Sequence, residues 1–415
     1  MKDTAPTTLA LVDPDEIRTR FCAALSAMYR AEVPLYADLL DIVARVNAGA
    51  ADAASTPARV DIERHGAIRL GTPAELAMMG RAFAVMGMAP VGYYDLAPAG
   101  VPVHSTAFRP VSEAALARNP FRVFCSLLRL DLIADPDLRA EAAAILATRQ
   151  IFRAEAVALI EQHEAQGGLS ESEVDTFVAA LLETFRWHQE MLVDRATYER
   201  LVASHRLVAD IVAFRGPHIN HLTPRVLDID AAQAAMVAQG LDTKDSIEGP
   251  PRRAVPILLR QTSFKALTES VRFAGDTGAP GQHTARFGEI EQRGAALTPK
   301  GRALYDDLLA RASSADTAQP YAQRLALAFE SFPDDLETLV REGLIYVRRM
   351  ADGALEPLTY EDFLPVSAAG IFQSNLGNEQ RETYAQQGAQ SVFEEALGRA
   401  VLDPFALYAA MAEGG

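Results

Sequence analysis

Apolar residues recur every three or four positions along much of the chain, which predicts amphipathic helices. The stretches with this spacing are 14–48, 136–213, 299–309 and 379–407. Gly167 and Gly168 interrupt the second stretch and indicate a break between two helices. Thr72, followed by Pro73, is typical of the residue that caps the start of another helix.

Segments rich in β-branched residues separate these helical stretches and predict strands. We expect strands at 59–70, 91–96, 103–111, 226–229, 255–259, 284–290 and 344–349. Because helices and strands do not alternate regularly, the pattern favours an α+β fold with a central mixed β-sheet wrapped by helical segments. The expected organisation is an N-terminal tail over 1–13, a single catalytic domain over 14–410 with a helical insertion at about 112–213, and a C-terminal tail over 411–415.

Charge and cysteine content exclude several classes of protein. The 415 residues include 39 Lys and Arg against 55 Asp and Glu, a formal net charge of −16, which disfavours binding to nucleic acid or to an anionic membrane. No apolar run approaches the roughly 18 residues of a membrane-spanning helix. Cys22 and Cys125 lie in apolar runs and are expected to be free buried thiols, so we expect a cytoplasmic protein. The oligomeric state is not indicated.

Histidine and glutamate gather in three segments flanked by glycine or proline: 64–69, 216–224 and 287–294. They offer His65, one of His218 and His221, and one of Glu289 and Glu291. Two imidazoles and one carboxylate form the ligand set of non-haem Fe(II) oxygenases. In an extended chain His218 and His221 point to opposite faces, whereas Glu289 and Glu291 share one. Spacing alone therefore leaves both choices open.

Two arginines follow the candidate ligands at a regular interval. Arg69 lies four residues after His65, and Arg225 lies four residues after His221. In a strand such residues share a face about 13 Å apart along it. A planar guanidinium suits the carboxylate of a bound substrate, and the alternative is an arginine in a surface ion pair. Two further candidates whose roles the sequence leaves open are Lys265 and His104. Glycine-rich phosphate loops, nucleophile elbows and His-Glu-x-x-His motifs are absent from the sequence.

The motifs together resemble those of one enzyme family, the 2-oxoadipate dioxygenase/decarboxylases, also called hydroxyglutarate synthases. The segments that carry the resemblance are Arg64-His65-Gly66-Ala67-Ile68-Arg69, His218-Ile219-Asn220-His221-Leu222-Thr223-Pro224-Arg225, Phe287-Gly288-Glu289-Ile290-Glu291-Gln292-Arg293-Gly294 and Leu297-Thr298-Pro299-Lys300-Gly301. The resemblance implies that His65, His221 and Glu289 bind iron, and that Arg69 binds substrate together with the two histidines. The segment Leu364–Gly370 resembles the one that lines the substrate pocket, which points to Val366 and Ser367.

The resemblance also implies a fold and a reaction. The fold would be a curved sheet similar to that of vicinal-oxygen-chelate enzymes. The enzyme would use Fe(II) and O₂ to convert 2-oxoadipate into 2-hydroxyglutarate and CO₂ in lysine catabolism. The alternatives are the same iron site acting on another 2-oxo acid, or a hydrolase or isomerase that uses Zn²⁺ or Mn²⁺ on the same ligands.

Overall fold

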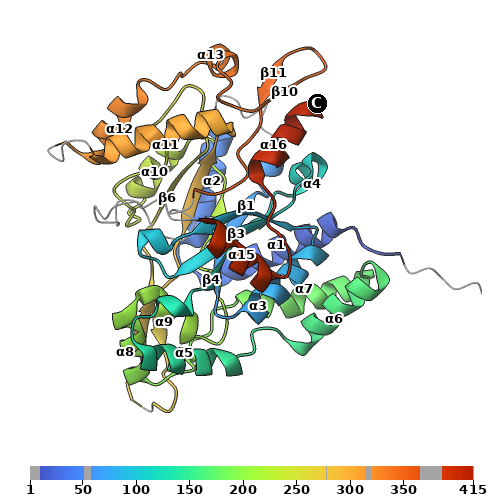
Figure 1. Cartoon of the computed structure of the whole chain (residues 1–415), viewed down its shortest axis with the longest axis vertical. Helices are drawn as coiled ribbons and strands as arrows, with labels where there is room; N and C mark the ends of the chain where they lie inside the picture. Colours follow the sequence, from blue (N-terminus) through green and yellow to red (C-terminus); the bar gives the residue numbers. More distant parts are fainter. Residues whose placement is uncertain (1–9, 51–57, 277, 315–318, 365–385, 415) are drawn as a thin grey trace, which may run out of the picture.

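A five-stranded mixed sheet lies at the centre of the computed structural model, which describes residues 10–50, 58–276, 278–314, 319–364 and 386–414 (Figure 1). In spatial order its strands are β2 (Ala89–Asp95), β3 (Val103–Arg109), β4 (Arg122–Leu128), β1 (Arg64–Leu70) and β5 (Leu222–Pro224). β1 and β4 run parallel, and the other neighbouring strands are antiparallel. The α+β class and the mixed sheet predicted from the sequence are confirmed.

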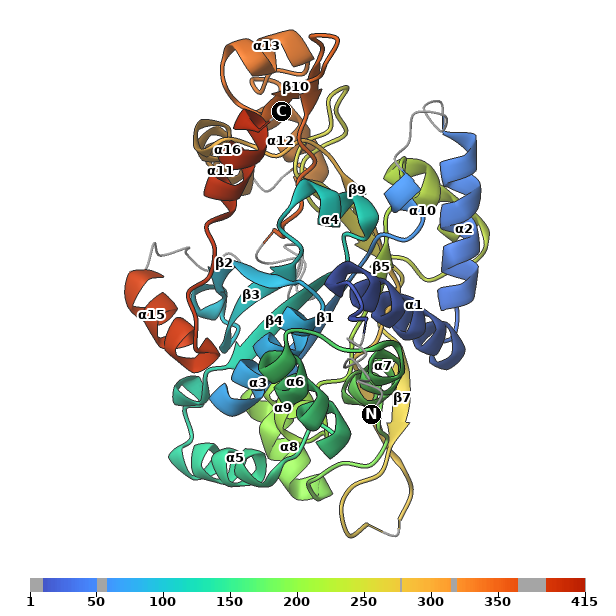
Figure 2. The same ribbon diagram turned by 90° about the vertical axis from the view of Figure 1, so that its right-hand side faces the viewer.

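Helices cover both faces of this sheet and divide its side chains into two cores. Ile68 and Leu70 of β1 belong to a core shared with α1 (Pro14–Glu32), α2 (Tyr36–Gly49), α3 (Pro73–Val85), α6 (Ala154–Gln166), α7 (Glu171–Phe185), α10 (Ile229–Ala238) and α15 (Gln386–Leu397). Figure 2 shows α1 and α7 side by side. Ala67 belongs to the other core, with α5 (Pro136–Thr148), α8 (Arg195–Ser204) and α9 (Arg206–Val212). Because alternate residues of a strand face opposite ways, His65 and Arg69 point to the side of Ala67.

A third hydrophobic core lies at the end of the molecule that is uppermost in Figure 1. It is built from α11 (Pro299–Ser314), α12 (Tyr321–Phe329), α13 (Leu336–Arg341) and α16 (Pro404–Glu413), beside the hairpin of β10 (Val347–Arg349) and β11 (Leu355–Pro357). The short helix α4 (Glu113–Arg118) joins β3 to β4. The proposed boundaries of a single domain over 14–410, with an insertion at about 112–213, stay a prediction.

A separate two-stranded sheet lies beside the β5 edge of the central sheet. β6 (Leu259–Ser263) pairs with β9 (Glu289–Arg293), and the hairpin of β7 (Thr268–Val271) and β8 (Gly281–Thr284) lies between them in sequence. The backbone N–H of Val226 donates to the carbonyl of Glu291 at 2.7 Å, which joins β9 to the chain that leaves β5. β1, β5 and β9 are therefore neighbours, although they are far apart in sequence.

Three of the predicted strands are wrong or displaced. The segment 226–229 is not a strand, because the Asp228 side chain accepts from the N–H of Ala231 and caps α10. The strand expected at 255–259 begins only at Leu259, and 284–290 spans the loop between β8 and β9. The helix expected over 14–48 is divided between α1 and α2 at Leu35, which has a φ of 68°.

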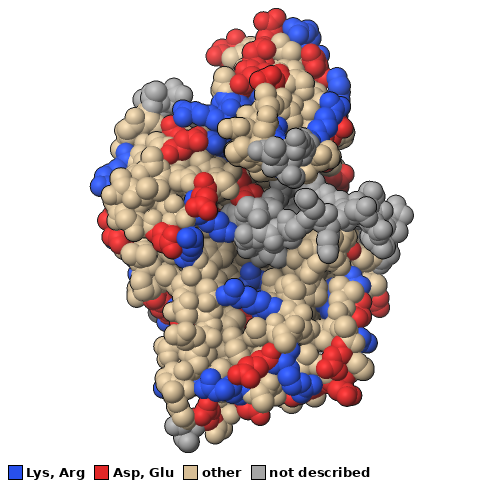
Figure 3. Space-filling model, turned by 90° about the vertical axis from the view of Figure 1, so that its left-hand side faces the viewer, with Lys and Arg blue, Asp and Glu red and all other residues tan. Residues whose placement is uncertain are grey.

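The surface carries both signs of charge. On the face drawn in Figure 3, acidic and basic side chains are interspersed. Among the described residues, no helix combines the length and the apolar character needed to cross a bilayer.

Candidate metal centre

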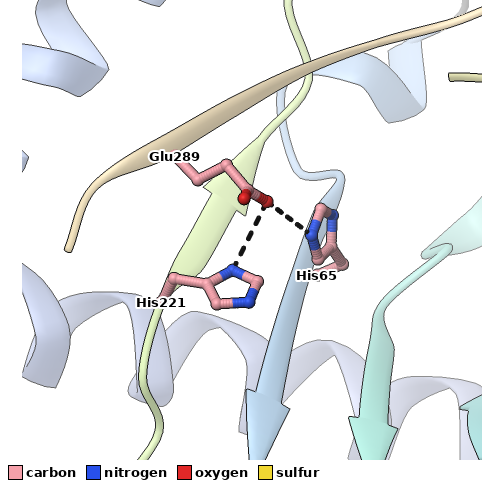
Figure 4. A group of neighbouring side chains, drawn as sticks. All are labelled: His65, His221 and Glu289. Carbon is pink, nitrogen blue, oxygen red and sulfur yellow. Dashed lines mark hydrogen bonds and ion pairs between the residues drawn. The ribbon is translucent and has the colours of Figure 1, made fainter. Parts of the chain in front are cut away.

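His65, His221 and Glu289 converge in the interior, where each side chain is at most 2% exposed (Figure 4). His65 lies in β1, His221 comes directly before β5, and Glu289 is the first residue of β9. One ligand atom from each residue lies within 4.8 Å of the other two. The three neighbouring strands thus bring together residues that are far apart in sequence, since His65 and Glu289 are separated by more than 200 positions.

Gly66 allows the chain that carries His221 to lie directly against β1. A Cβ at this position would stand 2.5 Å from Cδ1 of Ile219 and 2.8 Å from the carbonyl oxygen of His221. Any side chain here would push that segment away. The register places His65 opposite Thr223, which fixes the position of His221 relative to His65.

Thr223 determines which nitrogen of His221 is available to a metal. Its hydroxyl donates to Oε1 of Glu289 at 2.9 Å and lies 2.9 Å from Nδ1 of His221. Because the hydroxyl proton goes to the carboxylate, the hydroxyl oxygen accepts from Nδ1–H of His221. The lone pair of His221 is then on Nε2, which is buried and has no hydrogen-bond partner among the described residues.

Glu291 is an ion-pair partner of His65. Its Oε2 lies 3.0 Å from Nδ1 of His65, while Nε2 of His65 faces Oε1 of Glu289 at 3.0 Å. The contact with Glu291 does not have hydrogen-bond geometry, so it places a negative charge behind the ring. Burial raises the pKa of Glu291, but Arg293, which donates to its Oε1 at 2.8 Å, and His65 outweigh burial and lower the pKa. Glu291 is therefore an anion held behind the ring.

The donor set fits a divalent cation. Oε1 of Glu289 accepts from Thr223 and from Nε2 of Gln261 at 2.8 Å, whereas Oε2 is buried without a hydrogen-bond partner among the described residues. Burial lowers the pKa of His221 to about 4, so its neutral ring can bind a metal at neutral pH. Burial lowers the pKa of His65, but Glu291 and Glu289 together outweigh it and raise the pKa, so a metal ion would replace a proton there.

A network of buried ion pairs lies behind the site. Arg122, which is opposite His65 in the β1–β4 register, donates to Glu63 at 2.9 Å and also pairs with Glu361. Arg59 donates to the second oxygen of Glu361 at 2.7 Å. Removing one partner of such a buried pair leaves an uncompensated charge, so the network makes the local backbone costly to move.

Arg69 pairs with a carboxylate other than that of Glu289. It lies on the same face of β1 as His65 and donates from Nη1 to Oδ2 of Asp210 at 2.7 Å. His218 also faces Asp210, with Nε2 at 3.2 Å from Oδ1, so His218 and His221 point to different places, as expected for an extended segment. Val366 and Ser367 lie outside the described residues.

The remaining candidates point away from the centre. Arg225 pairs with Glu63 at 3.1 Å, and Lys265 pairs with Asp242 at 2.8 Å on the surface. His104 packs edge-on against Phe393, with ring centroids 4.8 Å apart. The partner that the structure gives Arg225 is thus the buried carboxylate of Glu63.

Sequence reasoning assigned no role to Thr223, Gln261 or Asp210. Thr223 was visible two residues after His221, and alternation along a strand would have put it beside the metal face. Gln261 belongs to β6, whose pairing with β9 is set by tertiary structure. No sequence pattern pointed to Asp210, because a single aspartate in a helix is usually an ordinary surface residue.

The buried group of two histidines and one glutamate on a mixed sheet could hold a metal ion, and its ligand types are those found in non-haem iron enzymes. The sequence model of the 2-oxoadipate dioxygenase/decarboxylase family matches residues 21–375, and the chain belongs to this family. A 2-oxoadipate dioxygenase/decarboxylase of Pseudomonas putida is 53% identical over 96% of this chain and 95% of its own length. One of Escherichia coli is 52% identical over 96% of each chain.

Solved structures show the same fold. A crystal structure of the hydroxyglutarate synthase from Pseudomonas putida in complex with 2-oxoadipate matches with a TM-score of 0.90 and 52% identity, over 97% of each chain. A putative glyoxalase superfamily protein from Ralstonia eutropha matches with a TM-score of 0.52 and 20% identity over 70% of this chain. The second match extends only to the fold, which agrees with the expected similarity to vicinal-oxygen-chelate enzymes.

Proposed function

We propose that this protein is an Fe(II)-dependent dioxygenase that converts 2-oxoadipate and O₂ into 2-hydroxyglutarate and CO₂. The observation that carries the proposal is the convergence of His65, His221 and Glu289 with buried donor atoms left unpartnered. The names of the relatives and the bound 2-oxoadipate in the matching crystal structure support the choice of substrate.

The two histidines and the glutamate would hold Fe(II) on one side and leave its other positions open. Bound there, Fe(II) would supply coordination of the 2-oxo acid and activation of O₂. The reaction breaks the bond between C1 and C2 of the acid and releases C1 as CO₂. One oxygen atom enters the new carboxylate, the other becomes the hydroxyl, and no proton is consumed between the two dianions.

The chain's own residues would orient the acid and keep water away from the centre. Phe287 stacks on the His221 ring with centroids 4.9 Å apart, and Phe363 meets the His65 ring edge-on at 5.0 Å. These rings exclude water from the side of the ligands that they cover. Arg69 would bind a carboxylate of the substrate through its guanidinium. Val366 and Ser367 would line the substrate pocket, as the resemblance implies.

The test is reconstitution of the metal-free protein with Fe(II) under anaerobic conditions, followed by 2-oxoadipate and O₂. We expect 2-hydroxyglutarate and CO₂ in a ratio of one to one, with both atoms of ¹⁸O₂ in the organic product. Faster O₂ uptake with 2-oxoglutarate or phenylpyruvate would instead indicate another 2-oxo acid as substrate. Turnover without O₂ would indicate a Zn²⁺- or Mn²⁺-dependent hydrolase or isomerase.

We also propose that the reaction takes place in the cytoplasm, and the cysteines support this. Cys22 and Cys125 are both free and buried, and burial raises the pKa of Cys22 to about 11, which keeps the thiol protonated and unreactive. Free thiols of this kind support the prediction of a cytoplasmic enzyme.

A further inference from the structure

A second buried cluster of charged side chains centres on Asp210 in α9. Its Oδ2 accepts from Nη1 of Arg69 at 2.7 Å, and its Oδ1 lies 2.9 Å from Nε2 of His283 and 3.2 Å from Nε2 of His218. The side chains of Asp210 and Arg69 are 9% and 11% exposed, and those of His218 and His283 are 2% exposed. These residues are separate from the group formed by His65, His221 and Glu289.

The hydrogen bonds of this cluster have a defined direction. Burial raises the pKa of Asp210, but His218 and Arg69 outweigh it and hold the pKa well below its ordinary value, so Asp210 is an anion that can only accept. His283 therefore donates from Nε2–H. Its Nδ1, which lies 2.8 Å from the hydroxyl of Tyr198, accepts from that hydroxyl. The chain runs from Tyr198 through His283 to Asp210, which Arg69 approaches from the other side.

Five segments of the chain contribute to the cluster: β1, α8, α9, the segment between α9 and β5 that carries His218, and β8. Aromatic rings enclose it, since Trp187 lies 4.5 Å from the His218 ring and Phe214 lies 4.8 Å from the His283 ring. Burying an aspartate with an arginine is costly unless the geometry is well satisfied. Here each carboxylate oxygen faces a nitrogen, so the position of the guanidinium is closely defined.

Transport of protons does not account for this arrangement, because the proposed reaction consumes and releases none. The position of Arg69 along β1 does account for the arrangement of the cluster. The Cα atoms of residues 65 and 69 are about 13 Å apart in a strand, so Arg69 is held at the far end of the metal-bearing face of β1. The C1 carboxylate and keto group of a 2-oxo acid belong at the metal, and the group that meets Arg69 is at the other end of the acid.

We propose that Asp210 is a positioning residue that holds Arg69 ready for the distal carboxylate of the substrate, and that His283 and His218 keep Asp210 in place. Selection of dicarboxylic over monocarboxylic 2-oxo acids through Arg69 would then depend on Asp210. A guanidinium has five N–H donors in a fixed fork, so one arginine can bind more than one carboxylate. This inference rests on the proposed function and extends it to the basis of substrate choice.

The test compares 2-oxoadipate with 2-oxohexanoate, a monocarboxylate of the same chain length, in wild type and D210N. Asparagine keeps the size of the side chain and loses its charge. We expect kcat/KM for 2-oxoadipate to fall about 10- to 100-fold, mainly through KM, because a charged partner is lost. For 2-oxohexanoate, which leaves Arg69 unused, the change should stay under threefold. A loss of the same factor for both acids, or no loss for either, would overturn the proposal.

A matched control and a milder variant keep the test decisive. E75Q removes the charge of another buried carboxylate, which accepts from Arg149 at 2.8 and 2.7 Å, and it should leave the ratio between the two acids unchanged. If D210N does not fold, Y198F removes only the hydroxyl that bonds to His283. It should lower the preference for 2-oxoadipate about two- to fivefold, as expected for one neutral hydrogen bond. An unchanged preference in Y198F would then contradict the proposal.

Binding distinguishes failure of this inference from failure of the proposed function. If wild type turns over neither acid with Fe(II) and O₂, the proposed function is wrong. Calorimetric dissociation constants of the two acids for the metal-loaded protein without O₂ still decide the role of Asp210. Selective weakening of 2-oxoadipate binding in D210N supports it, and equal weakening of both acids contradicts it.

Discussion

The hydroxyl of Thr223 offers a test of how the metal ligands are held. T223V keeps the branched shape of the side chain and removes only the hydrogen-bonding group. The variant would lose the 2.9 Å bond to Glu289 and the 2.9 Å contact with Nδ1 of His221 at the same time. His221 would then be free to change tautomer, and Glu289 would keep fewer of its donors.

The expected loss of metal affinity in T223V can be estimated from the hydrogen bond to the charged carboxylate of Glu289. A hydrogen bond to a charged group contributes about 1.5–3 kcal/mol, which corresponds to roughly 10- to 150-fold in metal affinity. Loss of a partner behind a metal ligand typically weakens metal binding about 10- to 100-fold. The two estimates agree, so we expect T223V to bind Fe(II) at least about tenfold more weakly than wild type.

Thr262 provides the matched control. It is also fully buried, and its hydroxyl has no hydrogen-bond partner among the described residues. It pairs with Ile290 in β9, so it points to the face opposite to that of Glu289. T262V should therefore leave the metal affinity unchanged.

The assay is anaerobic competition for Fe(II) between the metal-free protein and a coloured chelator, repeated with Co(II). Circular dichroism and thermal unfolding establish that both variants are folded. If T223V binds metal within threefold of wild type, or if T262V weakens binding as much as T223V does, the reasoning about the His221 tautomer is refuted.

Three further predictions concern the ligands, the substrate and acid stability. H65A, H221A and E289A should each lose bound iron in metal analysis, whereas H218A should retain it; the reverse result for His218 and His221 would contradict the assignment. R69A should lower kcat/KM for 2-oxoadipate about 10- to 200-fold, and a change under threefold would exclude its role. Burial raises the pKa of Glu361, but Arg59 and Arg122 outweigh it and lower the pKa to about 2. Its contribution to stability is therefore complete above its unfolded pKa of about 4.3 and is lost as the pH falls towards 2. The free energy of unfolding, measured with urea, should fall more steeply with decreasing pH in that window for wild type than for E361Q. Equal slopes would contradict the lowered pKa of Glu361.

Sequence patterns identified many helix ends because interactions between residues close in sequence form them. The side chain of Thr72 accepts from the N–H of Glu75 and caps α3, and Gly167 ends α6 before Ser170 starts α7. These features depend on neighbours within a few residues, which the sequence displays directly. The displaced strands at 226–229, 255–259 and 284–290 show the limit. β5 has only three residues, and β6 and β9 are short strands whose partners are distant in sequence.

The chemical groups that this protein can use are visible in its sequence, which displays the histidines, the glutamates and the arginine, and the family resemblance points to three of them as metal ligands. The spacing left two choices open, between His218 and His221 and between Glu289 and Glu291, and strand pairing places these four side chains. The register of β1 with β5 and of β5 with β9 puts His221 beside His65, turns His218 towards Asp210, and places Glu289 and Glu291 on opposite nitrogens of the His65 ring. Such positions depend on contacts between strands that are far apart in sequence, as with His65 and Glu289, which are 224 residues apart. No local pattern encodes that pairing, because burial of the sheet between its helices selects it.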